Sequence, residues 1–169
     1  MVNEHTHIFR AGDAPFTLPV EIGTRAILTG AKNAGKTTTL VSWIDVWKAQ
    51  GFAFSGVYTK AIFEHGRNAV YDLIELPSET CHPLIRRTPF ANSWKQGDYF
   101  FDASGFEALN TSLQSAHTAD LLILDEIGPL EFRRRSGLYP ALSTFLAMRL
   151  PLLIVARDAY VNELEALLS

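Results

Sequence analysis

The most constraining feature of this sequence is the segment Gly30-Ala31-Lys32-Asn33-Ala34-Gly35-Lys36-Thr37, which fits the pattern G-x-x-x-x-G-K-[ST] at every fixed position. An apolar run at residues 25–29 precedes it and predicts a short buried strand. Residues 37–50 follow, and their apolar positions fall on one face of a helix that stops at Gly51. A loop in this setting points successive backbone N–H groups at an anion, and the helix N-terminus adds positive potential. The segment therefore predicts a phosphate-binding loop.

The residue types in this loop suit contacts with a nucleotide. Gly30 and Gly35 allow tight bends, and Asn33 tolerates the positive φ that we expect in the middle of the loop. Lys36 would reach the β- and γ-phosphates, and the hydroxyl of Thr37 would bind Mg²⁺. We expect the nucleotide-binding residues to be the loop and the threonine after it: Gly30, Ala31, Lys32, Asn33, Ala34, Gly35, Lys36, Thr37 and Thr38.

A second chemical signal is the buried strand predicted at residues 121–124, which is followed directly by Asp125 and Glu126. Asp125 would hold Mg²⁺ through its water shell, because Mg²⁺ gives up water reluctantly. Glu126 is placed to orient and deprotonate a water that attacks the γ-phosphorus, which favours hydrolysis over transfer to a second substrate. The alternative for Glu126 is an exposed carboxylate, or one that starts a helix.

These segments together resemble a known family. The phosphate loop, Gly-Val-Tyr-Thr at 56–59, the Gly66-Arg67 turn and Asp-Glu-Ile-Gly-Pro-Leu-Glu at 125–131 are similar to the P-loop nucleoside-triphosphatase family, which includes the cancer-related nucleoside-triphosphatase and its thermophile relatives. The resemblance covers roughly residues 25–157 and implies a RecA-like core that hydrolyses ATP, GTP and other triphosphates broadly and slowly. It implies phosphate, metal and catalytic roles for Lys36, Thr37, Asp125 and Glu126. Asn33 departs from the family, which more often has Gly there.

The rest of the chain alternates predicted strands and helices, which favours a parallel sheet covered on both faces. Further strands are predicted at 52–59, 97–101 and 152–156, and further helices at 105–116, 136–149 and 160–168. Residues 1–20 are expected to form an irregular arm, with one extended piece at 16–20, and residues 77–89, which contain three prolines, to form a loop. We expect a single P-loop domain over 1–169, of the α/β class, with three layers, a mostly parallel central sheet and a β-hairpin insertion near 57–76.

Arginine is a candidate for stabilising the charge that spreads during γ-phosphate transfer. Arg157 follows the apolar strand predicted at 152–156, at the edge of the sheet where ligands bind in open α/β folds, and we assign it a catalytic role beside Glu126 and Lys36. Arg67 and the run Arg133-Arg134-Arg135 are alternatives, with a solvated surface charge as the simpler explanation. Glu131 either supports the metal shell or is a surface acid at a helix start.

Composition excludes several other classes. The chain has a net charge of -3 and no extended basic segment, so we expect no nucleic-acid partner. It has no apolar run long enough to span a bilayer, and residues 1–20 do not read as a signal peptide. Its single cysteine, Cys81, fits a reducing compartment, so we expect a cytoplasmic protein. The pair His5 and His7 lacks a third ligand and is not expected to bind a metal.

Other residue types are expected to serve packing. Trp43 and Trp47 share one helix face, and Cys81 and His82 read as loop or core residues rather than as a nucleophile and its base. The leading function is therefore Mg²⁺-dependent hydrolysis of ATP or GTP. A nucleotide-binding switch with slow hydrolysis, which would need a protein partner, and a small-molecule phosphotransferase are alternatives. No guanine-reading Asn-Lys-x-Asp pattern follows residue 125, so the base preference stays open.

Overall fold

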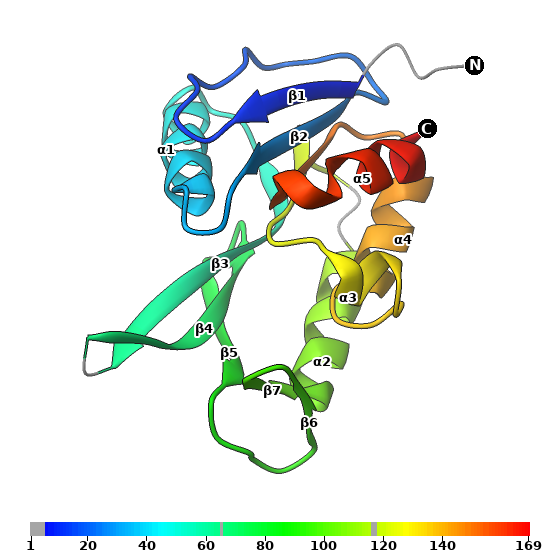
Figure 1. The fold of residues 1–169 in the computed structure, drawn as a ribbon. Coiled ribbons are helices and arrows are strands. Elements are labelled where there is room, and N and C mark those ends of the chain that lie inside the picture. Colours follow the sequence, from blue (N-terminus) through cyan, green and yellow to red (C-terminus); the bar gives the residue numbers. More distant parts are fainter. Residues whose placement is uncertain (1–5, 65, 116–117) are drawn as a thin grey trace.

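The computed structural model describes residues 6–64, 66–115 and 118–169 (Figure 1). The strands are β1 (Thr6–Arg10), β2 (Arg25–Gly30), β3 (Phe54–Glu64), β4 (Arg67–Leu76), β5 (Thr80–Arg86), β6 (Ser93–Gln96), β7 (Tyr99–Asp102), β8 (Leu121–Leu124) and β9 (Leu152–Arg157). The helices are α1 (Lys36–Ala49), α2 (Ala103–Gln114), α3 (Pro129–Phe132), α4 (Tyr139–Ala147) and α5 (Val161–Leu168), with a 3₁₀ turn at Asp158–Tyr160.

Over the described residues, all the strands join one nine-stranded sheet in the order β1-β2-β9-β8-β3-β4-β5-β7-β6. From β1 to β3 every neighbouring pair is parallel, and from β3 to β6 every pair is antiparallel. The sheet is therefore mixed, and the expectation of a mostly parallel sheet is wrong. The antiparallel half arises because the chain from β3 to β7 returns through short turns, which can connect only antiparallel neighbours.

The strand β3 belongs to both halves of the sheet. Its first residues pair in parallel with β8, from Phe54 opposite Leu121 to Val57 opposite Leu124, and its later residues pair antiparallel with β4. Beyond its pairing with β8, β3 continues with β4 as a two-stranded projection away from the helices (Figure 1). The strands β5, β7 and β6 come next in the order of the sheet. A hairpin inserted into a parallel sheet is therefore not confirmed. Its expected turn includes His65, which lies outside the described residues, as do the side chain of Arg67 and residue 116 of the expected 105–116 helix.

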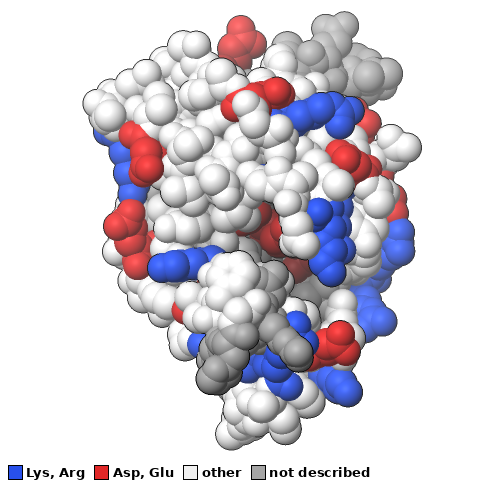
Figure 2. Space-filling view, turned by 60° about the vertical axis from the view of Figure 1, so that its left-hand side comes forward, with Lys and Arg blue, Asp and Glu red and all other residues white. Residues whose placement is uncertain are grey.

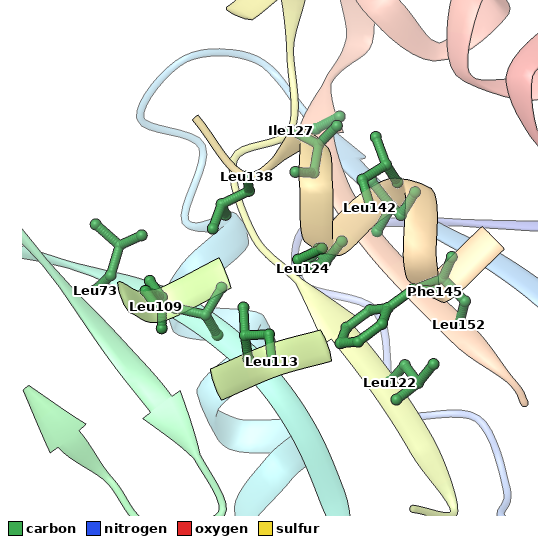
Figure 3. Close-up of a cluster of buried hydrophobic side chains, with 14 of the residues drawn as sticks. Leu73, Leu109, Leu113, Leu122, Leu124, Ile127, Leu138, Leu142, Phe145 and Leu152 are labelled. Atoms are coloured by element: carbon green, nitrogen blue, oxygen red, sulfur yellow. The ribbon is translucent and has the colours of Figure 1, made fainter. Parts of the chain in front are cut away.

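Alternating side chains of the parallel strands enter two separate cores, as the two-residue period of a strand requires. One core lies between the sheet and the helices α2, α4 and α5 (Figure 3). In it, Leu122 and Leu124 of β8 meet Phe145 of α4 and Leu113 of α2. The intervening residue of β8, Ile123, enters the other core, beneath α1. Helices thus cover both faces of the parallel half, and the strands read as continuous apolar runs for that reason.

The second core joins α1 to the chain before β2. Trp43 and Trp47 of α1 are each 1% exposed, which confirms them as packing residues. Their rings contact Phe16, and the indole N–H groups donate to backbone oxygens of Asp13 and Phe16 at 2.8 and 2.9 Å. The expected irregular arm over 1–20 is wrong in part, because β1 adds a parallel edge strand beside β2. His5 lies outside the described residues, so the His5–His7 pair stays a sequence-level expectation.

Other expectations also fail beyond the parallel core. The expected loop at 77–89 contains β5, and Cys81 and His82 lie on this strand rather than in a loop. The Sγ of Cys81 donates to Oδ2 of Asp72 at 3.3 Å, and Nε2 of His82 lies 2.7 Å from Oε2 of Glu75, so both residues hold β5 to β4. No helix among the described residues is long and apolar enough to cross a membrane.

Candidate functional site

The predicted site residues meet at the carboxyl edge of the parallel half of the sheet. Gly30 ends β2 and lies opposite Arg157, the last residue of β9, in the register of the sheet. The next strand, β8, ends at Leu124 and places Asp125 and Glu126 at the same edge. Carboxyl ends of parallel strands are where open α/β sheets bind ligands. Residues 30–38, 125–126 and 157 are therefore brought to one edge, as the sequence predicts.

The loop between β2 and α1 has the backbone of an anion cradle. Asn33 has φ 60° and Gly35 has φ 83°, the left-handed conformations that turn successive N–H groups toward one point. Ala31, Lys32, Asn33, Ala34 and Gly35 are exposed. A Cβ at Gly30 would come within 3.2 Å of the Cβ of Ala34 and within 3.3 Å of that of Ala11. The loop is therefore closely packed where it begins, at Gly30, and exposed to solvent over residues 31–35.

Lys36 is the first residue of α1 and is 4% exposed. Its Nζ donates to the backbone oxygen of Ala31 at 2.9 Å, across the base of the loop. The ammonium is thus held inside the curve of the loop, where it faces whatever the N–H groups bind. Thr38, the next residue but one, is exposed on the first turn of α1.

Thr37 and Asp125 form the contact that joins the loop to β8. The Thr37 hydroxyl donates to Oδ2 of Asp125 at 2.9 Å, and the backbone N–H of Thr59 on β3 donates to the same oxygen at 2.9 Å. Asp125 is 1% exposed, and its Oδ1 is buried with no hydrogen-bond partner among the described residues. Burial, and then the charge of Glu126, raise the pKa of Asp125 to about 7.

These oxygens suit Mg²⁺, which prefers carboxylate, hydroxyl, phosphate and water oxygens. A buried carboxylate oxygen without a partner is costly, and a cation beside it would remove that cost. Within the described ranges, no group of three His, Cys, Asp or Glu residues is arranged to hold a metal alone. Thr37 and Asp125 would therefore supply the protein's part of a shell that water and phosphate oxygens complete.

Glu126 has an unusual backbone. It has φ 58°, in the left-handed region that non-glycine residues rarely adopt, at a cost on the order of 1–2 kcal/mol. The side chain is exposed, whereas Asp125 and Ile127 on either side are buried. The N–H of Ile127 donates to the oxygen of Val155 on β9 at 3.0 Å, which holds the turn in place. The strained backbone thus points one carboxylate outward at the edge where the loop lies.

Glu131 does not lie on the surface as its simpler alternative expected. It is 5% exposed, and its carboxylate accepts from the N–H of Gly128 at 3.0 Å and from the N–H of Leu138 at 3.3 Å. Burial raises the pKa of Glu131 to about 7, although these two hydrogen bonds act in the opposite direction. The side chain caps α3 and ties it to the start of α4. Its hydrogen-bond partners thus lie in the segment after Glu126.

The arginine candidates separate in the structure. Arg157 is exposed at the end of β9 and lies in register with Gly30, so the site includes its backbone position. Arg133 is paired instead with Glu163 of α5, with its Nε donating to Oε2 at 3.0 Å. Arg134 donates to Gln96 at 3.4 Å, and Arg135 lies over the ring of Tyr139. Over the face drawn in Figure 2, basic and acidic side chains are interspersed.

Sequence reasoning missed three residues at this edge. The N–H of Thr59 holds Asp125, and the hydroxyl of Thr39 both donates to the oxygen of Gly35 at 3.0 Å and accepts from the N–H of Gly12 at 2.9 Å. Asp158 accepts from the hydroxyl of Thr29 at 2.8 Å. The signal for Thr59 was its place in the Gly-Val-Tyr-Thr segment. The other two contacts depend on tertiary packing, which the local pattern does not encode.

Comparisons with known proteins agree with this geometry. A family model described as NTPase matches residues 25–168. The chain is 29% identical over 108 residues to the nucleoside-triphosphatase THEP1 of Methanopyrus kandleri, covering 63% of this chain and 59% of that relative. It is 32% identical over 114 residues to the human cancer-related nucleoside-triphosphatase, covering 62% and 60%. The chain thus aligns with less than two thirds of the length of these relatives.

Solved structures show the same fold. The solution structure of the human cancer-related nucleoside triphosphatase has a TM-score of 0.61 and 28% identity, covering 78% of this chain and 74% of that one. The crystal structure of THEP1 from the hyperthermophile Aquifex aeolicus has a TM-score of 0.58 and 18% identity, covering 84% and 81%, and shows likeness of fold alone. The fold is of the P-loop NTPase-like α/β type. Because the family model covers residues 25–168, the chain belongs to the NTPase family, as the resemblance predicted.

Proposed function

We propose that this chain is a Mg²⁺-dependent nucleoside triphosphatase that releases the γ-phosphate of ATP or GTP. One observation carries the proposal: the hydroxyl of Thr37, in the first turn of α1, donates at 2.9 Å to the carboxylate of Asp125, directly after β8. Oδ1 of this carboxylate is buried and has no hydrogen-bond partner in the described part of the chain. The relatives' names, nucleoside-triphosphatase, support the same reaction. The free cysteine Cys81 fits a cytoplasmic location.

Binding would begin at the loop. The N–H groups of residues 31–38 face the phosphate oxygens, and the N-terminus of α1 adds positive potential. Lys36 would exchange its bond with the oxygen of Ala31 for bonds with the β- and γ-phosphates. This exchange requires only rotation of a side chain whose ammonium already lies inside the loop.

Mg²⁺, when bound, would neutralise charge on the β- and γ-phosphate oxygens. Thr37 would hold it through its hydroxyl, and Asp125 through Oδ1 directly or through a bound water. The N–H of Thr59 fixes Oδ2 of Asp125 and so orients Oδ1. A cation at this place would also lower the pKa of Asp125 from its raised value of about 7, so that the ionised carboxylate persists at neutral pH.

Glu126 would accept a proton from the water that attacks the γ-phosphorus. Its strained backbone turns the carboxylate toward solvent directly after the metal residue, and backbone strain of this kind concentrates at functional sites. We assign Arg157 the role of stabilising negative charge on the transferring phosphoryl group, because it ends β9 opposite Gly30. Glu126 and Arg157, with Lys36, account for binding, activation and charge stabilisation.

The experiment that tests this function is phosphate release from ATP, GTP, CTP and UTP by the purified chain, with Mg²⁺ and with EDTA. We expect phosphate release that requires Mg²⁺ and falls to background in Lys36→Ala. The control is Lys48→Ala, which removes an exposed lysine from the same helix. Release that persists unchanged in EDTA, or in Lys36→Ala, would mean that a different site or a contaminant performs the reaction.

A further inference from the structure

The family model begins at residue 25, yet the segment before it packs against the predicted phosphate loop. After β1, the N–H of Ala11 donates to the oxygen of Thr29 at 2.8 Å, and the N–H of Gly12 donates to the hydroxyl of Thr39 at 2.9 Å. The indole of Trp43 on α1 donates to the oxygen of Asp13. Residues 10–13, which we term the β1 turn, are thereby fixed against both sides of the loop.

The β1 turn is also fixed within itself. Oδ2 of Asp13 accepts from the N–H of Arg10 at 2.7 Å, and the N–H of Asp13 donates to the oxygen of Arg10 at 2.9 Å. The Cβ of Ala11 would lie 3.3 Å from a Cβ at Gly30, so the turn touches the first glycine of the loop. A segment outside the family match therefore forms one wall beside the candidate phosphate site.

The order of the strands suggests which end of a bound nucleotide would lie toward β8 and which toward β1. The residues proposed to act at the terminal phosphate, Asp125 and Glu126, follow β8, which lies two strands from β2 on one side, and β1 is the neighbour of β2 on the other side. A triphosphate is a chain with the γ-phosphate at one end and the nucleoside at the other. With its γ-phosphate toward β8, the nucleoside leaves the loop on the side of β1.

The side chains of Arg10 and Asp158 lie at the β1 side of the loop. Arg10 NH1 lies 3.6 Å from Oδ1 of Asp158, and the two side chains are 72% and 48% exposed. The hydroxyl of Thr29, on β2, donates to the same oxygen and so fixes Asp158 beside the loop. A guanidinium and a carboxylate together offer donors and acceptors to ribose hydroxyls and to a base edge. Such an exposed pair contributes little to stability, so it is available to a ligand.

We propose that the β1 turn and Asp158 form the nucleoside subsite, with Arg10 and Asp158 as its polar contacts. The inference rests on the proposed function, because it takes the direction of the nucleotide from Asp125 and Glu126. It adds a specific role for a segment that the family model does not include. Arg10 donates to acceptors on the base or ribose, and Asp158 accepts from ribose hydroxyls or a base amino group.

The test compares nucleotides with inorganic tripolyphosphate, which has the phosphates and lacks the nucleoside. Calorimetry would measure the Kd of MgATP, MgGTP and magnesium tripolyphosphate for the full chain, Arg10→Ala, Asp158→Asn and the control Arg149→Ala. Arg149 is also exposed and precedes β9, at the opposite edge of the sheet. Asn at 158 keeps an oxygen that can accept from Thr29. Thermal unfolding of each variant checks that the fold is retained.

We expect Arg10→Ala and Asp158→Asn each to weaken nucleotide binding by about tenfold, as loss of a hydrogen bond to a charged group does, with tripolyphosphate binding unchanged. Arg149→Ala should bind all three ligands as the unaltered chain does. Equal weakening of nucleotide and tripolyphosphate, or no weakening of either, would overturn the subsite while leaving the phosphate site intact. Failure of the unaltered chain to bind tripolyphosphate or nucleotide would overturn the proposed function, and the subsite with it.

Discussion

The hydroxyl of Thr37 donates to the buried carboxylate of Asp125 at 2.9 Å, which joins the first turn of α1 to the end of β8. The two residues are far apart in the chain, and the parallel pairing of β2, β9 and β8 brings them together. Oδ1 of the same carboxylate has no partner among the described residues. The contact thus brings the predicted phosphate loop and the acidic strand end together in one candidate site.

Asp125→Ala should remove the dependence of nucleotide binding on Mg²⁺ and leave metal-free binding largely intact. The reason is that Asp125 supplies the only buried carboxylate beside Thr37 in the described part of the chain. Titration of ATP with Mg²⁺ and with EDTA measures both affinities. The control is Asp120→Ala, which lies before the amino end of β8. A variant at 125 that keeps the full effect of Mg²⁺ would place the metal residue elsewhere.

Lys36→Ala should abolish tight triphosphate binding. The ammonium is the positive charge at the centre of the loop, and Ala removes it without altering the N–H groups. Calorimetry with MgATP gives the affinity. Binding as tight as that of the unaltered chain is the outcome that this assignment does not allow.

Glu131→Gln should make the stability of the protein less dependent on pH. Burial raises the pKa of Glu131 to about 7, against about 4.3 in an unfolded chain. The folded state therefore binds the proton more tightly, so the free energy of unfolding falls as pH rises from about 4.3 to about 7. Gln removes this contribution and keeps one oxygen to accept from Gly128.

Urea unfolding at pH 5, 6 and 7 measures this effect. We expect the decrease in unfolding free energy across this range to be smaller in Glu131→Gln than in the unaltered chain. Asp125, whose pKa is also raised, contributes to both proteins and cancels in the comparison. Equal slopes for the two proteins would show that Glu131 is ionised in the folded state at pH 5.

Gly56→Ala should destabilise the fold strongly, because β3 passes close to β8 at this residue. A Cβ there would lie 1.8 Å from the backbone oxygen of Ile123, and neither backbone can move without breaking the sheet. We expect a loss above about 4 kcal/mol, which marks a severe steric clash. The matched control is Gly51→Ala, which also has positive φ but has open space around it, and should cost about 1–2 kcal/mol. Similar unfolding midpoints for the two variants would contradict the close approach.

The phosphate loop and β8 could be predicted because their information is local. Gly30, Gly35 and Lys36 stand at fixed spacing between a strand and a helix, and residues 121–124 form an uninterrupted apolar run before Asp125. Their buried pattern results from covering both faces of a parallel strand. The placement of these residues at one edge of the sheet follows from parallel pairing, whereas their individual distances depend on the tertiary structure.

The strands β1 and β5 could not be predicted, because tertiary contacts form them against their local preference. The exposed edge strand β1 has few apolar residues and is held by pairing with β2. Pro83 lies within β5, where it reads as a loop residue, and the register of β4 and β5 shifts between Tyr71 and Leu73 near this point. Proline is tolerated at such irregularities, since a missing N–H breaks no regular bond there.

The burial of Glu131 could also not be predicted from the local sequence. An acid three residues after Gly128 reads equally well as an exposed N-terminal helix residue or as a capping residue. The choice depends on Leu138, whose backbone N–H donates to this carboxylate. Glu131 and Leu138 are only seven residues apart, but the turn between α3 and α4 that brings them together is not encoded in a local pattern.

The central claim, that Glu126 activates the attacking water, is tested most directly by the single-turnover rate of Glu126→Gln with enzyme in excess over nucleotide. Gln keeps the size of the side chain and cannot accept the proton at neutral pH. The account predicts that γ-phosphate release slows by about 100-fold or more while MgATP binding is retained, so the variant holds unhydrolysed triphosphate. A single-turnover rate equal to that of the unaltered chain would contradict it.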